Sequence, residues 1–322
     1  MEFDDGELVD IELAQNGDVA APKNGKIALI DADTVVFGSV TKHQEVIELL
    51  PREMYSDEEW ANISSMKTYD PEAGTIAICN MDNAYQSTLE KLQGILDATG
   101  CEDWELHFTI GRGSFRYTKI DPMYKANRLE MKSPDGLSEL KVKMAETFPD
   151  KAFIHYDFEA DDAVIAKKKA QPDKYILCAV DKDVLYTLPG RHFNYYSRAA
   201  TTTKAGNNLD EIKMTFFDVE PEQAMKHHYK QCLTGDTGDN VIGLAKVGPK
   251  TADKILAGAS SAAECWERVV NEYEARGRDV FDAIKNMRLV SMHQISYDPE
   301  TDSYSLELWR PETNNNKGEN NE

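Results

Sequence analysis

Four short apolar runs, separated by segments with helical spacing of their apolar residues, most constrain the fold of this 322-residue chain. Each run is short and mostly apolar, which is typical of a strand buried in a sheet. Helices are predicted in the intervals, over 82–97 with Asp82 as N-cap, over 137–148 and over 159–169. Strands that alternate with helices predict an α/β fold around a central, mostly parallel sheet. The runs are KIALID (26–31), ELHFT (105–109), AFIH (152–155) and YILCAV (175–180).

Composition and pattern divide the rest of the chain into segments with different expected structure. The first and last segments are polar and lack apolar periodicity, so we expect tails there. TIAIC (75–79) is a further predicted strand, and no function is assigned to 34–80. The segments are an acidic disordered tail (1–25), an α/β core (26–218) that includes an arch (110–148), a helical subdomain (219–297) with a helix–hairpin–helix (233–258), and a terminal strand with a polar tail (298–322).

The formal net charge of −21 argues, at first sight, against a nucleic-acid partner, because binding to phosphates needs Lys and Arg. The charge is unevenly spread, however. Residues 1–25 hold seven acids and one Lys, and residues 298–322 hold seven acids and two bases. Residues 112–132 hold six bases and two acids, so this segment is locally basic and suits a polyanion.

Five cysteines without a CxxC pair argue against a disulfide framework and against a zinc site. No run approaches the length of a membrane span, and the acidic start MEFDDGELVD is unlike a signal or transit peptide. We therefore expect a cytoplasmic protein. Gly111-Arg-Gly113 is not followed by a Walker lysine motif, so no nucleotide cofactor is expected.

Acidic residues recur where the predicted strands and turns end. One such residue alone is commonly a helix cap, but four acidic groups at equivalent places predict a shared site. Converging carboxylates repel one another unless a cation neutralises them, and ligand sets of oxygen alone favour Mg²⁺ or Mn²⁺. Eight carboxylates suit two ions, the arrangement used for phosphodiester hydrolysis. They are Asp31, Glu159, Asp161, Asp162, Asp181, Asp183, Asp236 and Asp239.

Two basic motifs complete the predicted site. In GLAKVGPKTADKIL (243–256), a short helix is predicted before Gly248, and a second helix near Lys250, with Lys246 adding charge. Such a turn can bind phosphate oxygens through exposed N–H groups, although a Gly-capped helix pair remains the alternative. In the second motif, Lys125 and Arg128 would hold a phosphate and Tyr124 would stack on a base; the alternative is a solvated basic helix. Arg116, in the same basic segment, is also predicted to contact DNA.

Taken together and in this order, the motifs resemble the 5′→3′ exonuclease and flap endonuclease family, most closely its phage replication members. The matching stretches cover most of the chain between 26 and 258. They are IALIDAD (27–33), FRYTKIDPMYKANR (115–128), FEADDAV (158–164), AVDKDVL (179–185) and LTGDTGDNVIGLAKVGPKTADKIL (233–256).

The resemblance implies a PIN-like nuclease core, a helical arch over the active site, a helix–hairpin–helix subdomain, and a K⁺ ion at the hairpin. It implies that Asp31, Glu159, Asp161 and Asp162 hold one Mg²⁺ ion, that the other four carboxylates hold a second, and that Mn²⁺ can substitute. Lys125 and Arg128 are the implied catalytic cations, with Asp31 and Asp162. One position departs from the family, which usually has an Asp after the strand before the arch: Thr109 or Ile110 stands there.

We therefore expect a 5′→3′ exonuclease or 5′ flap endonuclease that acts on DNA, and on RNA of RNA–DNA hybrids, in phage replication or recombination with other replication proteins. The departure at Thr109 motivates an alternative, a nuclease-inactive DNA-binding accessory protein. A small PIN-like RNase is a third reading, which the arch and hairpin motifs disfavour.

Overall fold

A six-stranded, mostly parallel sheet forms the centre of the protein in a computed structural model that describes residues 21–129, 131, 133–202 and 208–312. The strand order is β5-β4-β1-β6-β7-β8, and only the β7–β8 pair is antiparallel. The predicted α/β fold and its four core strands are confirmed. The strands are β1 (Ile27–Asp31), β4 (Asp103–Thr109), β5 (Ala152–His155), β6 (Tyr175–Ala179), β7 (Gly190–Thr202) and β8 (Asn208–Val219).

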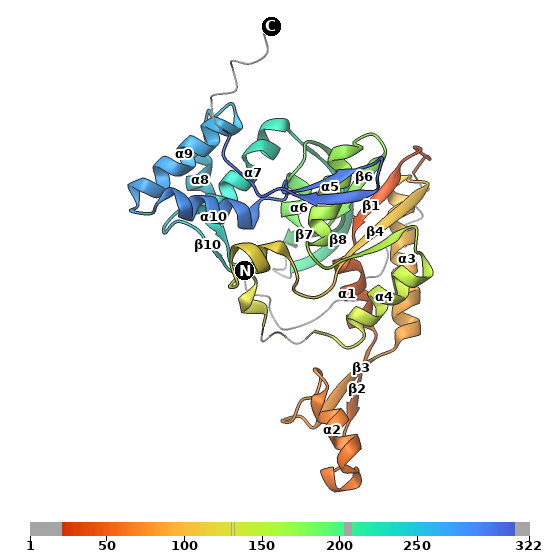
Figure 1. Ribbon diagram of the computed structural model, residues 1–322. Helices are drawn as coiled ribbons and strands as arrows, with labels where there is room; N and C mark the ends of the chain where they lie inside the picture. The colour runs from red at the N-terminus through yellow and green to blue at the C-terminus, as the bar shows by residue number, and fades with distance from the viewer. Residues whose placement is uncertain (1–20, 130, 132, 203–207, 313–322) are drawn as a thin grey trace.

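Helices cover both faces of the sheet, as the alternation along β1 requires. Ala28 and Ile30 pack into one hydrophobic cluster with α1, α3 and α4, while Leu29 packs into another with α5 and α6. Figure 1 shows α1, α3 and α4 together. The helices are α1 (Asp33–Lys42), α3 (Met81–Thr99), α4 (Leu137–Thr147), α5 (Ala160–Ala170) and α6 (Lys182–Tyr186).

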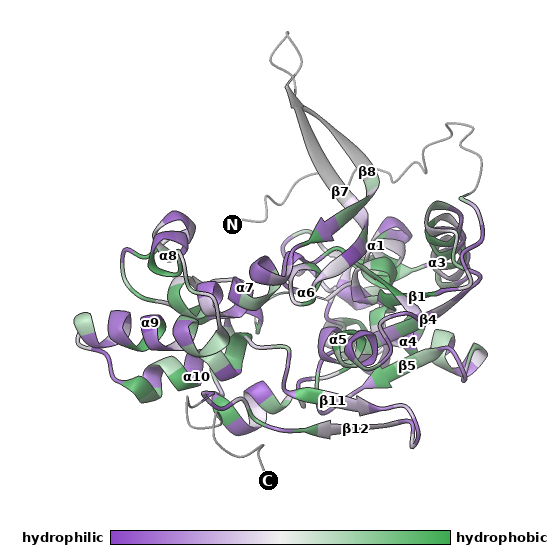
Figure 2. Cartoon of the chain, turned by 90° about the horizontal axis from the view of Figure 1, so that it is seen from above, coloured by the Kyte–Doolittle hydropathy of each residue, from purple (hydrophilic) through white to green (hydrophobic). Residues whose placement is uncertain are grey.

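The helical region after the sheet packs around a hydrophobic cluster of its own, in which Trp266 and Tyr273 are large members. The chain then returns to the core, where β11 contacts α5, and Figure 2 shows β11 and β12 side by side. The elements are α7 (Pro221–Thr234), β9 (Gly235–Asp236), β10 (Val241–Ile242), α8 (Pro249–Ile255), α9 (Ala262–Ala275), α10 (Val280–Val290), β11 (Ile295–Asp298) and β12 (Ser303–Leu306).

The segment between α1 and α3 projects from the sheet (Figure 1). TIAIC is a strand, as predicted, but it pairs with β2 outside the central sheet. The Trp60 ring packs against Tyr55 and Tyr69, with ring centroids 5.8 Å apart in both pairs, so the projection has a small aromatic core. Its elements are β2 (Gln44–Glu48), a 3₁₀ turn (Arg52–Met54), α2 (Asp57–Ser65) and β3 (Thr75–Cys79).

Several local predictions need correction. Asn80, not Asp82, caps α3, because its side chain accepts the Asn83 N–H. No helix precedes Gly248: the segment 243–247 is a turn that follows the β9–β10 ribbon. In the segment predicted as an arch, α4 packs in the core through Leu140, and short helical turns lie at Arg116–Ile120 and Ala126–Arg128.

The predicted tails lie mainly outside the described residues, which begin at 21 and end at 312. Residues 21–25, expected in the N-terminal tail, are attached to the core, since the Ala21 N–H donates to Asp97 O at 2.8 Å. No helix among the described residues is long and apolar enough to span a bilayer. The predicted domain boundaries stay predictions.

The turn between α7 and β10 depends on two glycines. A Cβ at Gly235 (φ +74°) would lie 2.3 Å from the Gly243 backbone nitrogen. Gly235→Ala should therefore lower the free energy of unfolding by about 3 kcal/mol or more, through backbone strain and a clash. Gly258→Ala is the control, because its φ of +76° is similar but nothing lies within 4 Å; we expect a loss of about 1 kcal/mol. Equal losses in urea unfolding would contradict the close approach.

Candidate active site

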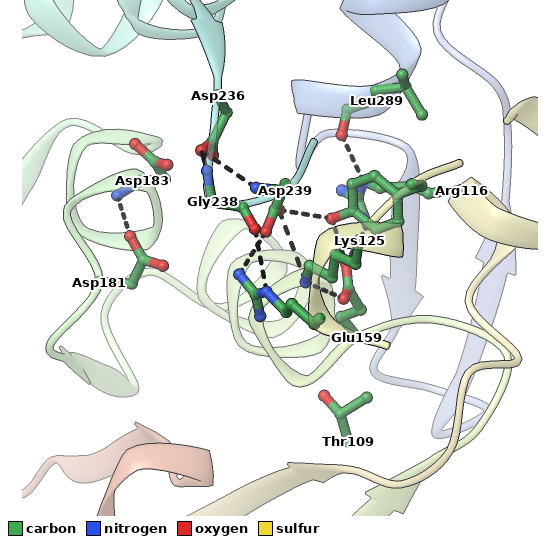
Figure 3. Close-up of polar contacts among 12 residues, drawn as sticks. Thr109, Arg116, Lys125, Glu159, Asp181, Asp183, Asp236, Gly238, Asp239 and Leu289 are labelled. Atoms are coloured by element: carbon green, nitrogen blue, oxygen red, sulfur yellow. Dashed lines mark hydrogen bonds and ion pairs between the residues drawn. The ribbon is translucent and has the colours of Figure 1, made fainter. Parts of the chain in front are cut away.

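The site lies at the carboxyl ends of the central strands, where the chain changes direction across the sheet. β1 pairs with β4 on one side and with β6 on the other, so the order of the strands reverses direction at β1. Such a switch point opens a crevice beyond the carboxyl ends of the strands. Asp31 ends β1, Asp181 caps α6 after β6, and Glu159 caps α5 after β5. Asp236 and Asp239 enter from the β9–β10 ribbon (Figure 3).

All eight predicted carboxylates come together there. Oxygen atoms of Glu159, Asp161 and Asp162 lie within 4.8 Å of one another. Asp31 is repelled by Asp181, and Asp181 in turn by Asp183, Asp239 and Asp236. The carboxylates at the edge of the sheet and those next to the helical region therefore form one negative cluster.

Burial and mutual repulsion raise the pKa values of most of these carboxyls. Burial, followed by the charges of Asp33 and Asp181, raises the pKa of Asp31 to about 8. Burial and Glu159 hold the pKa of Asp161 well above its usual range. Burial and Asp183 raise the pKa of Asp181, and burial and Asp239 raise that of Asp236. Oxygen donors that are this hard to ionise fit a divalent cation, which would replace the bound protons.

Arg116 neutralises the innermost part of the cluster. Its guanidinium donates two hydrogen bonds to Asp162, at 2.6 and 2.7 Å, and one to Glu159 at 3.3 Å. It also donates to the carbonyls of Leu289 (2.8 Å) and Ser291 (2.9 Å). Arg116 is only 2% exposed, and its predicted contact with DNA stays a prediction. The pairing also occupies both oxygens of Asp162, so among the predicted ligands Asp162 is the least available to a metal.

Tyr124 belongs to the interior of the site and not to its surface. Its hydroxyl lies 2.9 Å from a Glu159 oxygen and 2.8 Å from an Asp239 oxygen, and the residue is 6% exposed. The ring is buried in this structure, and the assignment of Tyr124 to base stacking stays a prediction. Burial and the negative charge of Glu159 hold the pKa of Tyr124 well above its usual range, so the hydroxyl keeps its proton and bridges the two carboxylates.

Lys125 and Arg128 both reach carboxylates at the rim of the cluster, and Figure 3 shows Lys125 beside Glu159. Lys125 pairs with Glu159, and its ammonium lies 3.6 Å from Asp239. Arg128 pairs with Asp239 at 2.6 Å and is half-exposed. Burial would raise the pKa of Glu159, but the charges of Lys125 and Arg116 outweigh it and lower the pKa to about 2.

Thr109 stands where the expected carboxylate is missing. Its backbone N–H donates to Asp33 at 3.1 Å, and its hydroxyl accepts the Ala160 N–H at 2.9 Å. Lys141, on α4, pairs with Asp33 at 2.8 Å. Sequence reasoning did not assign Asp33 or Lys141, because nothing in a helical pattern shows that these distant residues meet. It also did not assign His227, whose Nε2 lies 3.3 Å from an Asp183 oxygen.

Lys246, Gly248 and Lys250 lie apart from the carboxylates and are exposed, at the turn before α8 and on its first residues. Lys246 adopts a left-handed backbone with φ of 62°, so the turn is sharp there. The assignment of these residues to DNA stays a prediction.

Removing the guanidinium of Arg116 should destabilise the folded protein. Arg116→Met leaves Asp162, which is fully buried, without its partner, so we expect the free energy of unfolding to fall by about 3–5 kcal/mol. Chemical denaturation of the purified variant measures it. Arg112→Met, at an exposed arginine nearby, is the control and should change stability by less than about 0.5 kcal/mol. A similar small change for both variants would show that the buried pair is dispensable.

The raised carboxyl pKa values predict how stability depends on pH and metal. A carboxyl whose folded pKa is raised stabilises the fold fully below its ordinary pKa, and this contribution is lost as pH rises toward about 8, the value for Asp31. The opposite contribution of Glu159 is lost only as pH falls toward about 2, so it is constant in this window. Buried histidines with lowered pKa values, such as His155 and His293, shift stability in the opposite direction in part of this window. The carboxyl contribution is therefore measured as the difference in melting temperature in EDTA between the wild type and Asp31→Asn, which should move against the wild type from about pH 5 to about pH 8.

Divalent metal should reverse that loss, because it competes with protons for the same oxygens. We expect Mg²⁺ to raise the melting temperature more at about pH 8 than at about pH 5. Asp31→Asn is the comparison variant and should weaken the pH dependence. An equal effect of Mg²⁺ at both pH values would argue against carboxylate ligands.

Known proteins resemble parts of this chain. No family model matches it. DNA polymerase I of Lactococcus lactis subsp. cremoris is 26% identical over 196 residues, 57% of this chain and 21% of the polymerase. DNA polymerase I of Streptococcus pneumoniae is 28% identical over 168 residues, 50% of this chain and 18% of the polymerase. The chain thus spans about a fifth of the length of these relatives.

Solved structures share the fold over more of the chain. The 5′-exonuclease of bacteriophage T5 with bound zinc matches with a TM-score of 0.52 at 15% identity, over 83% of this chain and 90% of that protein. The flap endonuclease of the same phage, in a complex with DNA and metal ions, matches with a TM-score of 0.48 at 16% identity, over 65% of this chain and 81% of that protein. The chain therefore has the fold of the T5 5′-exonuclease, whose family its motifs resemble.

Proposed function

We propose that the protein is a metal-dependent 5′ nuclease that hydrolyses DNA phosphodiesters near a 5′ end or at a 5′ flap. The observation that carries the proposal is the cluster of mutually repelling carboxylates, three of which lie within 4.8 Å of one another, bordered by Lys125 and Arg128. A binding module gains nothing from such repulsion, whereas hydrolysis of a phosphodiester uses closely spaced cations. The likeness to the T5 exonuclease fold and to parts of DNA polymerase I supports the same reading.

The oxygen donors fit Mg²⁺, with Mn²⁺ as an alternative. Asp31, Glu159, Asp161 and Asp162 would hold one ion. Asp181, Asp183, Asp236 and Asp239 would hold the other. When bound, such ions lower the pKa of a water and stabilise the leaving 3′ oxygen. Tyr124 keeps Glu159 and Asp239 at a fixed separation, because its hydroxyl touches both.

Lys125 and Arg128 would bind the scissile phosphate. In this structure they pair with Glu159 and Asp239, but a phosphate oxygen is an equivalent partner for an ammonium or guanidinium group. The half-exposed Arg128 can reach a substrate without unfolding its surroundings. Both residues would then stabilise the negative charge that develops during hydrolysis.

The exposed Lys246 and Lys250 would bind phosphates of the duplex behind the cut. Gly248 would allow a phosphate to approach the backbone closely, and a K⁺ ion would bind at the same turn. These contacts do not read sequence, so the substrate would be recognised by its 5′ end or flap. The proposal also includes RNA of RNA–DNA hybrids as a substrate and other replication proteins as partners. The protein would act in phage replication or recombination, in the cytoplasm of the infected host.

A second reading, a nuclease-inactive DNA-binding accessory protein, has one observation in its favour. Thr109 supplies a hydroxyl, already bonded to Ala160, where a carboxylate is expected. Metal-dependent cleavage separates the two readings, because an accessory protein would bind DNA and leave it intact.

Removing two ligands of the second ion should abolish cleavage. We expect Asp181→Asn with Asp183→Asn to lose at least about 100-fold in rate on 5′-labelled duplex and flap DNA, because their negative charges hold metal at the site. Asp150→Asn, at an exposed acid, is the control and should cleave normally. Wild-type cleavage must need Mg²⁺ or Mn²⁺ and stop in EDTA. Full activity of the double variant would contradict the metal assignment. Tight DNA binding without cleavage by the wild type would favour the accessory reading.

A further inference from the structure

Lys141 is a buried lysine whose charge lies at the edge of the carboxylate cluster. It comes from α4 and is 8% exposed. Its ammonium lies 2.8 Å from an oxygen of Asp33 and donates a hydrogen bond of 2.8 Å to the Thr109 carbonyl. Both partners stand where the α1 and β4 ends face the site. A lysine buried to this degree is retained only when it is paired, so the contacts are specific.

Thr109 joins this ion pair to the elements that carry the candidate ligands. Its N–H donates to Asp33, at the start of α1 and two residues after Asp31. Its hydroxyl accepts from the first residue of α5, Ala160, next to Glu159 and Asp161. The carboxylate of Asp33 is thus fixed at the end of β4, beside the main chain of the residue that carries no carboxylate of its own.

The cations around the cluster pair with carboxylates in different parts of it. Arg116 pairs with Asp162 and Glu159, while Lys125 and Arg128 pair with Glu159 and Asp239. In the part of the chain that the structure describes, the recorded ion pair of Asp33 is with Lys141. Lys141 is therefore the protein's own counter-charge at the Asp33 corner, where it competes with any divalent cation for that oxygen.

We propose that Asp33 is a latent metal ligand, held out of the cluster by Lys141, in the place where Thr109 provides no carboxylate. The inference rests on the proposed metal-dependent function, but it concerns a residue outside the eight predicted ligands. Lys141 lowers the affinity of the adjacent ion site in two ways: it occupies an Asp33 oxygen, and its positive charge repels a bound cation. Removing the ammonium should free Asp33 and tighten metal binding.

The test is Mn²⁺ affinity, measured by electron paramagnetic resonance without DNA. Lys141→Met keeps the unbranched side chain as far as Cε and removes the ammonium, so we expect Mn²⁺ to bind about tenfold more tightly than in the wild type. Lys141→Met with Asp33→Asn removes both charges, so the affinity should return to that of the wild type. Lys143→Met, on the same helix, is the matched control: Lys143 pairs with the exposed Asp82 at 3.2 Å and should leave the affinity unchanged.

Unchanged or weaker Mn²⁺ binding by Lys141→Met overturns the proposal, because Asp33 would then be a structural residue. Tighter binding that persists in the double variant also overturns it, since the gain would not come from Asp33. Thermal unfolding shows whether each variant is folded, and Lys141→Arg, which keeps the charge, should bind Mn²⁺ like the wild type even if Lys141→Met does not fold. Cleavage is scored separately: a protein that binds Mn²⁺ as expected but cuts no DNA would refute the nuclease and not the ligand.

Discussion

Repulsion among closely spaced carboxylates is the constraint on which the rest of this structure depends. The parallel sheet brings Asp31, Asp181 and Glu159 to one edge, and the β9–β10 ribbon adds Asp236 and Asp239. Without compensation, this concentration of negative charge would oppose folding. The chain answers it with cations from one short segment, Arg116 to Arg128, and with protons on the carboxyls whose pKa is raised.

The same segment connects the sheet to the helical region. Arg116 holds Asp162 on α5 while donating to the carbonyls of Leu289 and Ser291, at the end of α10. Tyr124 likewise touches Glu159 on one side and Asp239 on the other. The contacts that neutralise the carboxylates are thus also the contacts that place the two halves of the site against each other, so the geometry of the cluster and the packing of the halves depend on the same side chains.

Sequence reasoning recovered the fold and the carboxylates because both leave local signals. Short apolar runs marked the four core strands, and acids at their ends marked the site, since parallel strands end at one edge. It failed where the outcome depends on partners distant in the chain. Arg116 and Tyr124 read as surface residues of a basic segment, but Asp162 and Asp239 draw them inward. The Asp33–Lys141 pair and the β7–β8 ribbon were likewise missed, because neither a helical period nor a charge count reveals which residues meet.

The projection between α1 and α3 has a consequence for how such a chain can diverge. Its two ends lie side by side, with the Asn80 N–H donating to the His43 carbonyl at 2.9 Å, and the aromatic rings that pack together in it come from within the segment. A piece that enters and leaves the body at one point, and supplies its own packing, transmits little of its internal change to Asp31 or β4. Substitutions in the projection can therefore accumulate at a rate of their own, while the residues at the sheet edge stay under separate constraint.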